Sequence, residues 1–211
     1  MNDLPLTNKE VLTALTPAEV LQMLRKGNER YMAGEGLSRD HRRSRQLTAT
    51  GQYPYAVVLS CIDSRVIPEA IFNAGIGEMF VVRIAGNIVN RDILGSMEYA
   101  CAVTGSKVIV VLGHTACGAV KGAVDGVVLG NLTGALRPLQ LAVTMADPQN
   151  HMENTSSDKE FVDIVARKNV EITMEDIRGQ SAVLREMEEQ GRILIAGAMY
   201  DHVTGKVEWM E

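Results

Sequence analysis

Two short motifs in this sequence contain residue types that bind metal ions. CIDSR spans residues 61–65 and HTACG spans residues 114–118, and each follows a run of apolar residues. Cys61, His114 and Cys117 together offer two thiolates and one imidazole, a ligand set that suits zinc(II) in a tetrahedral site. Because the two motifs lie far apart in the chain, the fold itself would have to bring the three ligands together.

Three protein ligands leave one position of a tetrahedral zinc ion open. Bound zinc lowers the pKa of water from about 15.7 to near 7, so an open position would supply zinc-bound hydroxide at neutral pH. Asp63 lies two residues after Cys61 and could instead close the site as a fourth ligand. Arg65 could hold the Asp63 carboxylate in a two-pronged salt bridge, which would turn it away from the metal. Asp63 would then only accept a hydrogen bond from the hydroxide.

Other interpretations of these residues are weaker. A redox pair of Cys61 and Cys117 has no CxxC motif to support it. A purely structural zinc site is a stronger competitor, although such sites are usually closed by a fourth Cys or His. Cys101 lies in the amphipathic segment SMEYACAV and is interpreted as a core residue. The remaining histidines have polar surroundings and are interpreted as surface residues, with a proton relay through one of them as a weaker option: His41, His151 and His202.

Four short runs rich in Val and Ile are predicted to form a central, mainly parallel four-stranded sheet, because they lack strict alternation. They cover residues 56–61, 79–85, 107–114 and 192–200. Helical periodicity at residues 66–75, 92–103 and 172–191 separates them, so the chain is predicted to be a single α/β domain with helices flanking the sheet. Both ligand motifs then follow carboxyl ends of strands, where open parallel sheets bind ligands.

The first fifty residues are predicted to form an N-terminal helical arm. Residues 51–211 would form the zinc-binding α/β catalytic domain, within one structural domain overall. A helix is expected after Thr16, with Thr16 as its cap, Pro17 at the first position, Glu19 in a capping box and Gly34 at its end. Two further segments are expected at the surface, namely the basic cluster Arg39, Arg42, Arg43 and Arg45 and the polar loop 147–158.

The composition limits the class of protein. The chain has 211 residues, of which 46% are hydrophobic and 22% charged, the balance of a globular domain in water. A net charge of -5 with only 4% aromatic residues argues against a nucleic-acid binder. We see no signal peptide and no apolar stretch near the ~18 to 20 residues that span a membrane. Three cysteines favour a reducing compartment over a disulfide framework, so we expect a cytoplasmic protein.

The motifs CIDSR, RIAGNIV, GSMEYA and VVLGHTACGAV, in this order, resemble the β-class carbonic anhydrases. The resemblance extends over roughly residues 16–209, and the closing segment that begins NVEITMEDIRG is typical of bacterial members. It implies reversible hydration of CO2 to bicarbonate and a proton, and a homodimer or a dimer of dimers, a homotetramer, with active sites at the dimer interface. It also implies one Zn(2+) per chain on Cys61, His114 and Cys117, with Asp63 and Arg65 as the catalytic dyad.

The resemblance further implies which residues bind the substrate. Gln52 matches a glutamine that donates a hydrogen bond to the substrate, and Phe80 and Tyr99 match aromatic residues of the pocket. In the family these three are contributed across the dimer interface. Gly118 matches a glycine whose backbone N–H faces bicarbonate. Ala85 stands where some members have Val, which would widen the apolar wall of a slot suited to CO2.

Two departures from the family pattern have consequences. Ile84 stands where the family commonly has Asn, so any hydrogen bond made by that Asn is missing. Val58 stands where one subgroup has a tryptophan that helps form a regulatory bicarbonate site. We therefore expect the open state, with Asp63 paired to Arg65 and without that switch.

Two alternative functions remain from the sequence. The first is hydrolysis of CS2 or COS on the same scaffold, where Ala85 would accommodate a larger sulfur atom. The second is a non-catalytic protein that binds zinc or bicarbonate. The presence of both Asp63 and Arg65 argues against the second, because a protein without catalysis could have lost either residue.

Overall fold

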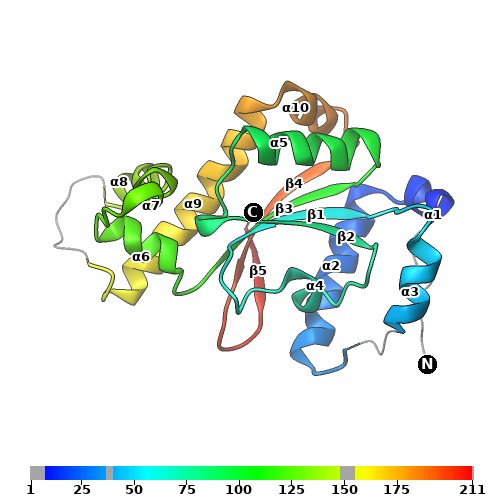
Figure 1. Cartoon of the computed structure of the whole chain (residues 1–211), viewed down its shortest axis with the longest axis horizontal. Coiled ribbons are helices and arrows are strands. Elements are labelled where there is room, and N and C mark those ends of the chain that lie inside the picture. The colour runs from blue at the N-terminus through cyan, green and yellow to red at the C-terminus, as the bar shows by residue number, and fades with distance from the viewer. Residues whose placement is uncertain (1–7, 37–39, 148–154, 211) are drawn as a thin grey trace.

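The computed structural model describes residues 8–36, 40–147 and 155–210, which form a central sheet covered by helices on both faces (Figure 1). The strands lie in the order β2-β1-β3-β4-β5, and the first four are parallel while β5 runs antiparallel to β4. Their bounds are β1 Ala56–Ser60, β2 Met79–Arg83, β3 Val108–His114, β4 Leu194–Tyr200 and β5 Val207–Met210.

The predicted α/β class and the four predicted strands are confirmed, but the sheet has five strands rather than four. The segment VEWM forms β5, which pairs with β4 through Tyr200 and Val207. Sequence reasoning missed it because it is only four residues long and carries no run of Val and Ile. The hairpin that connects β4 to β5 becomes important at the site described below.

The sheet sends alternate side chains into two separate cores. Val57 and Leu59 of β1 join one hydrophobic cluster with the helices α5 (Arg91–Glu98), α9 (Lys159–Gln180) and α10 (Ala182–Glu189). Ala56 and Val58 join a second cluster with α2 (Pro17–Met32) and α4 (Pro68–Ile71). Figure 1 shows α5 and α10 on one side of the sheet and α2 and α4 on the other. All seven residues of β3 are buried, as expected of a strand covered on both faces.

The helices before and between the first three strands are mostly short. They are α1 Lys9–Ala14, α2 Pro17–Met32, α3 His41–Thr48, α4 Pro68–Ile71, a 3-10 turn at Ala85–Asn87, α5 Arg91–Glu98 and a π-helical turn at Tyr99–Val103. Helix α2 begins with the predicted capping box. The Glu19 backbone N–H donates to the Thr16 side chain, and the Thr16 backbone N–H donates to the Glu19 carboxylate. It ends at Met32, two residues before Gly34.

The chain between β3 and β4 contains more helix than the sequence pattern indicated. It forms α6 Gly118–Val124, α7 Gly130–Leu136, α8 Leu139–Ala146, α9 Lys159–Gln180 and α10 Ala182–Glu189. The prediction of a single helix at residues 172–191 is wrong. Asp158 caps a helix that starts much earlier, and Ser181 divides the segment because its side chain caps α10. Most of the predicted loop at 147–158 lies outside the described residues.

The N-terminal segment and the surface agree with the sequence in part. Helix α3 has no buried residue, so Arg42, Arg43 and Arg45 lie on a solvated face, while Arg39 is outside the described residues. Leu12 of α1 and Leu24 of α2 pack into the second cluster, the one that contains Ala56 and Val58 of β1. No helix in the described parts of the chain is both long and apolar enough to cross a membrane.

Gly113 provides a test of how closely α9 approaches β3 beside the ligand His114. A Cβ at this position would lie 2.7 Å from the Val170 side chain and 2.6 Å from the Met199 sulfur. We expect Gly113→Ala to lower the free energy of unfolding by about 1–3 kcal/mol, because the added methyl overpacks the interface. Urea unfolding followed by circular dichroism measures this. Gly179→Ala on α9, where a Cβ meets nothing within 4 Å, is the control, and equal stability of the two variants would contradict the close packing.

Candidate metal centre

The fold brings together the three predicted ligands at the carboxyl edge of the sheet. Cys61 directly follows β1, His114 is the last residue of β3, and Cys117 immediately precedes α6. All three are buried, and their ligand atoms lie within 4.8 Å of one another. The two sulfurs are 3.9 Å apart, far longer than the ~2.05 Å of a disulfide. Since β1 pairs with β2 on one side and β3 on the other, the cluster lies where the strand order reverses.

The geometry of this cluster fits a zinc ion. Two sulfurs bound at about 2.3 Å in a tetrahedron would be separated by about 3.8 Å, close to the separation of Cys61 and Cys117. His114 Nε2 is buried and has no hydrogen-bond partner, whereas Nδ1 lies 2.9 Å from the Thr115 carbonyl oxygen. A buried imidazole nitrogen without a partner is costly unless it binds something. The donor set therefore suits a metal ion in contact with Nε2 and both sulfurs.

Each of the two thiols strongly shifts the pKa of the other. The hydrogen bond from Cys117 lowers the pKa of Cys61 to about 4, while the same bond raises the pKa of Cys117, with burial adding to the rise. The hydrogen bond between the two sulfurs therefore favours the thiolate at Cys61, which accepts the proton of Cys117. A cation that binds both sulfurs as thiolates replaces this proton, because metal ligation requires deprotonated cysteine.

The 3-10 turn at Ala85–Asn87 contacts the Cys61 sulfur through its backbone and is itself held by a buried side chain of α9. The Gly86 N–H, at φ +75°, points to the Cys61 sulfur with a separation of 3.5 Å. The Asn169 side chain of α9 donates to the Gly86 carbonyl at 2.8 Å and is itself buried. Sequence reasoning missed Asn169, although a polar residue within the apolar stripe of a helix is a signal that could have found it.

Arg83 fixes the chain that carries Cys61 and Asp63. Its Nε donates to the Cys61 carbonyl at 3.1 Å, and its Nη2 donates to the Asp63 carbonyl at 2.6 Å. Because Arg83 ends β2, the two strands β1 and β2 together determine the path of this loop. Its position at the end of an apolar strand is a sequence signal that could have found this role.

The loop between His114 and Cys117 is held by two other elements. Ala116 adopts a left-handed conformation with φ 54°, which costs a non-glycine residue energy. Its backbone N–H donates to Asp163 of α9 at 3.1 Å, and the Thr115 N–H donates to the Tyr200 carbonyl of β4 at 3.0 Å. These contacts turn the chain sharply enough for Cys117 to face back toward Cys61.

Asp63 and Arg65 form a bidentate pair beside the cluster. Arg65 Nε donates to Asp63 Oδ1 at 2.9 Å and Nη2 donates to Oδ2 at 2.7 Å, while the Arg65 backbone N–H also donates to Oδ1 at 3.0 Å. The Arg65 side chain holds the pKa of the Asp63 carboxyl well below its usual range. A carboxylate oxygen of Asp63 lies within 4.8 Å of a ring nitrogen of His114.

His202 is not a simple surface residue, which corrects the sequence interpretation. It is half-buried in the turn between β4 and β5, and its Nε2 lies 3.0 Å from His114 Nδ1. Burial lowers the pKa of His202. His41 is exposed, as expected, and His151 lies outside the described residues.

The predicted substrate-binding residues fall into two groups. Ala85 precedes Gly86 in the 3-10 turn at the cluster, and Gly118 directly follows Cys117. Phe80 instead pairs with Val57, four residues before Cys61, and contacts Tyr99 edge-on at 6.3 Å between ring centroids. Gln52 is exposed and lines another cavity, with Lys9 and Tyr53. The structure of one chain therefore does not bring Gln52, Phe80 and Tyr99 to its own cluster of Cys61, His114 and Cys117.

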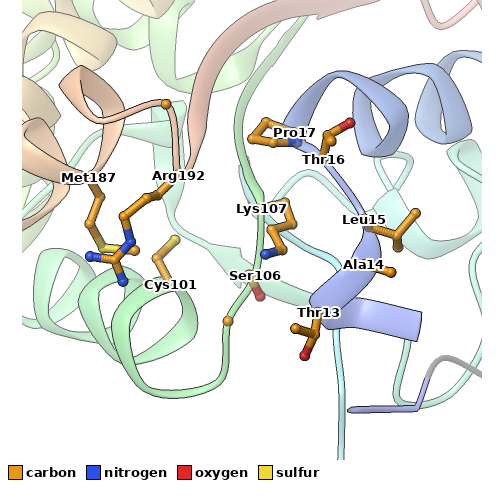
Figure 2. A pocket seen from close by; sticks show the side chains of 12 residues that line it. Thr13, Ala14, Leu15, Thr16, Pro17, Cys101, Ser106, Lys107, Met187 and Arg192 are labelled. Atoms are coloured by element: carbon orange, nitrogen blue, oxygen red, sulfur yellow. The ribbon is translucent and has the colours of Figure 1, made fainter. Parts of the chain in front are cut away.

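Cys101 is separate from the site. It is buried, and burial raises the pKa of its thiol to about 12, in agreement with a core residue. It contributes to a cavity of about 320 Å³ at the opposite edge of the sheet, before β3 and β4 (Figure 2). Figure 2 shows Cys101, Met187 and Arg192 on one side of this cavity and Thr13, Thr16 and Pro17 on the other.

The fold and the cluster define a class of protein: an α/β protein with a candidate metal site of two cysteines and one histidine at the switch point of a parallel sheet. Comparison with known sequences then gives the family, because the profile named carbonic anhydrase matches residues 56–207. Carbonic anhydrase 2 of Mycobacterium tuberculosis is 36% identical over 195 residues, which cover 90% of this chain and 91% of that protein. Carbonic anhydrase of Mycolicibacterium smegmatis is 34% identical, with 91% and 92% covered.

Solved structures agree with the sequences. A tetrameric β-carbonic anhydrase of Sordaria macrospora superimposes with a TM-score of 0.71 at 26% identity, over 91% of this chain and 97% of that one. The β-carbonic anhydrase of Coccomyxa, in complex with acetazolamide, gives a TM-score of 0.71 at 25% identity, over 92% and 85%. The chain belongs to the β-class of the carbonic anhydrase family, and it is an enzyme of that family.

Proposed function

We propose that this chain catalyses the reversible hydration of CO2 to bicarbonate and a proton at a zinc ion held by Cys61, His114 and Cys117. The observation that carries the proposal is the geometry of these ligands beside a carboxylate already paired with Arg65. The curated relatives bear the name carbonic anhydrase, which favours CO2 over CS2 or COS as the substrate. Nothing in the described residues favours a purely structural metal, because no fourth Cys or His completes the set.

The zinc ion would supply Lewis acidity, since it lowers the pKa of water in its open coordination position toward about 7. Asp63 would orient the water or hydroxide at that position by accepting a hydrogen bond from it. Asp63 Oδ1 already accepts two hydrogen bonds, but Oδ2 accepts only one and can accept another. Because Arg65 keeps Asp63 ionised, the carboxylate can accept a hydrogen bond but has no proton to donate.

The bidentate pair also keeps the coordination position open. To bind the metal, Asp63 would have to give up the two side-chain bonds from Arg65. Gly118 would present its backbone N–H to the anionic product, and Ala85 would form part of the apolar wall for CO2. Gln52, Phe80 and Tyr99 would complete the pocket from a partner subunit.

We also infer a dimer that is built on the outer edge of β2. This strand ends the sheet, and its apolar residues Phe80, Val81 and Val82 are only half-buried. Phe80, Val82 and Tyr99 line a cavity of about 660 Å³, and Tyr99 is 49% exposed. An apolar edge strand favours association, so we infer that a second copy of the chain covers it.

The tetramer remains an expectation from the family, and the cytoplasmic location remains an expectation from the three cysteines. Residues 51–211 would be the catalytic unit and residues 1–50 its arm.

The zinc proposal predicts different effects for two buried cysteines. Cys117→Ala should lose most of the metal and the activity, because two remaining ligands hold zinc weakly. Cys101→Ala should keep about one zinc per chain, although it loses packing in the core. Metal analysis by plasma mass spectrometry and a stopped-flow CO2 hydration assay measure both quantities. A wild-type protein without zinc, or a Cys117→Ala variant with full zinc, would overturn the proposed site.

The Asp63–Arg65 pair predicts a loss of turnover without a loss of metal. Asp63→Asn and Arg65→Ala should each lower kcat by about 100-fold or more, because the group that orients the reactants is lost or released. Zinc content should stay near one per chain in both variants. Arg42→Ala, on the exposed helix α3, is the matched control for removing a positive charge. Unchanged kcat in the Asp63→Asn variant would remove the pair from the mechanism.

The dimer proposal predicts that a charge at the β2 edge weakens association. Tyr99→Glu should raise the dimer dissociation constant by at least about tenfold, because it places a carboxylate in an apolar contact. Sedimentation velocity over a range of concentrations measures this constant. Val128→Glu, at a position 82% exposed between α6 and α7, is the control. A wild-type chain that sediments as a monomer at all concentrations would show that the edge is not an interface.

A further inference from the structure

The ligand His114 has a second histidine against it, in a part of the fold that the three-ligand cluster does not use. The ring of His202 meets the ring of His114 at 4.9 Å between centroids and an interplanar angle of 62°. His202 Nε2 lies 3.0 Å from His114 Nδ1. This is hydrogen-bond distance between two nitrogens, so one of them donates and the other accepts.

The donor can be assigned from the position of the metal ligands. The neutral imidazole that binds a metal carries its proton on the other nitrogen. Since His114 Nε2 is the buried nitrogen without a partner, Nδ1 carries the proton and donates it. Two acceptors are in reach, the Thr115 carbonyl at 2.9 Å and His202 Nε2 at 3.0 Å. His202 must then carry its own proton on Nδ1, an atom that is buried and has no hydrogen-bond partner among the described residues.

The turn that carries His202 is rigidly held. The His202 backbone N–H donates to Thr115 Oγ1 at 3.2 Å, which ties this turn to the loop that follows His114. The Asp201 carboxylate accepts from the backbone N–H groups of Val203 and Thr204, and so closes the turn on itself. On its other side the His202 ring packs edge-on against Tyr200, at 5.3 Å between centroids.

We propose that His202 is a positioning residue of the metal centre, which accepts a hydrogen bond from His114 Nδ1 and so orients Nε2 toward the two thiolates. The inference rests on the proposed zinc site. An acceptor behind a metal-binding histidine fixes the plane and the tautomer of its ring and makes the ligand nitrogen more basic. Here the backbone carbonyl of Thr115 supplies one acceptor, and His202 supplies a second from another element. The two together leave the ring little freedom to rotate.

The same atoms could be read as part of a second metal site, because Asp63, His114 and His202 also offer ligand atoms within 4.8 Å of one another. That arrangement is less favourable. It would share His114 with the cysteine site, and Asp63 would have to leave Arg65. The number of zinc ions per chain separates the two possibilities, since the positioning role needs only one.

The test compares variants that keep or remove the acceptor. His202→Gln places an amide oxygen near the position of Nε2 and keeps an acceptor, whereas His202→Phe keeps a ring against Tyr200 without one. His202→Leu is a second variant without an acceptor, in case the Phe variant does not fold. His41→Phe, on the exposed helix α3, is the matched control for replacing a histidine.

Two readouts are independent of turnover. The first is the rate at which the zinc-loaded protein loses zinc to excess 4-(2-pyridylazo)resorcinol. We expect it to rise by about 10-fold in His202→Phe and to stay near wild type in His202→Gln and His41→Phe. The second is the NMR resonance of the His114 Nδ1 proton in the zinc-loaded protein. It should shift upfield in His202→Phe and return toward the wild-type position in His202→Gln.

The outcomes are distinct. Unchanged zinc loss and an unchanged Nδ1 resonance in the variants without an acceptor would overturn the inference. A folded His202→Gln variant that behaves like His202→Phe would show that the ring, rather than the hydrogen bond, matters, and would also overturn it. Two zinc ions per wild-type chain would favour the second metal site instead. A wild-type chain that binds no zinc would refute the proposed function itself.

Discussion

The lateral register of β1 on β3 is the constraint on which the whole site depends. Ser60 pairs with Leu112, so Cys61 leaves its strand beside Gly113 and next to His114. A slip of one residue would turn alternate side chains to the opposite face of the sheet and separate the ligands. The register is well determined because both strands are buried on both faces, by two different clusters. The metal site thus derives its precision from the apolar core rather than from its own polar contacts.

This dependence explains why helix α9 contributes so much without providing a ligand. Its residues Val165 and Val170 pack in the core that covers the sheet. Two of its polar residues reach the turns around the ligands: Asn169 bonds to Gly86, whose N–H contacts the Cys61 sulfur, and Asp163 bonds to Ala116 between His114 and Cys117. His114 Nε2 is buried without a hydrogen-bond partner, and a buried polar atom costs free energy unless it binds something. The rigid surroundings keep the ligands in place, and binding of a cation offsets that cost.

The sequence was sufficient to predict the class of fold and that Cys61, His114 and Cys117 would come together, because soft ligand types after two buried runs of Val and Ile are a specific pattern. It was also sufficient to expect Asp63 to pair with Arg65, because the two lie in one short motif. It failed where a role depends on contacts between distant segments. His202 lies in a polar stretch of the sequence and looks like a surface residue, and only the hairpin of β4 and β5 brings it to His114. The early start of α9 was missed because the polar segment before it hides the cap at Asp158.

The balance of charge at the centre has a consequence for the reaction that it would support. Two thiolates neutralise a divalent cation, and Arg65 neutralises Asp63 through two hydrogen bonds. Arg83 adds one positive charge beside the centre, but its guanidinium is directed to the carbonyl oxygens of Cys61 and Asp63. A neutral, apolar substrate would enter such a site without an electrostatic barrier. The chain's net charge of -5 also repels an anion once it has left. On the proposed mechanism, the same pairing that keeps Asp63 away from the metal would leave the open position to the substrate and to the departing bicarbonate.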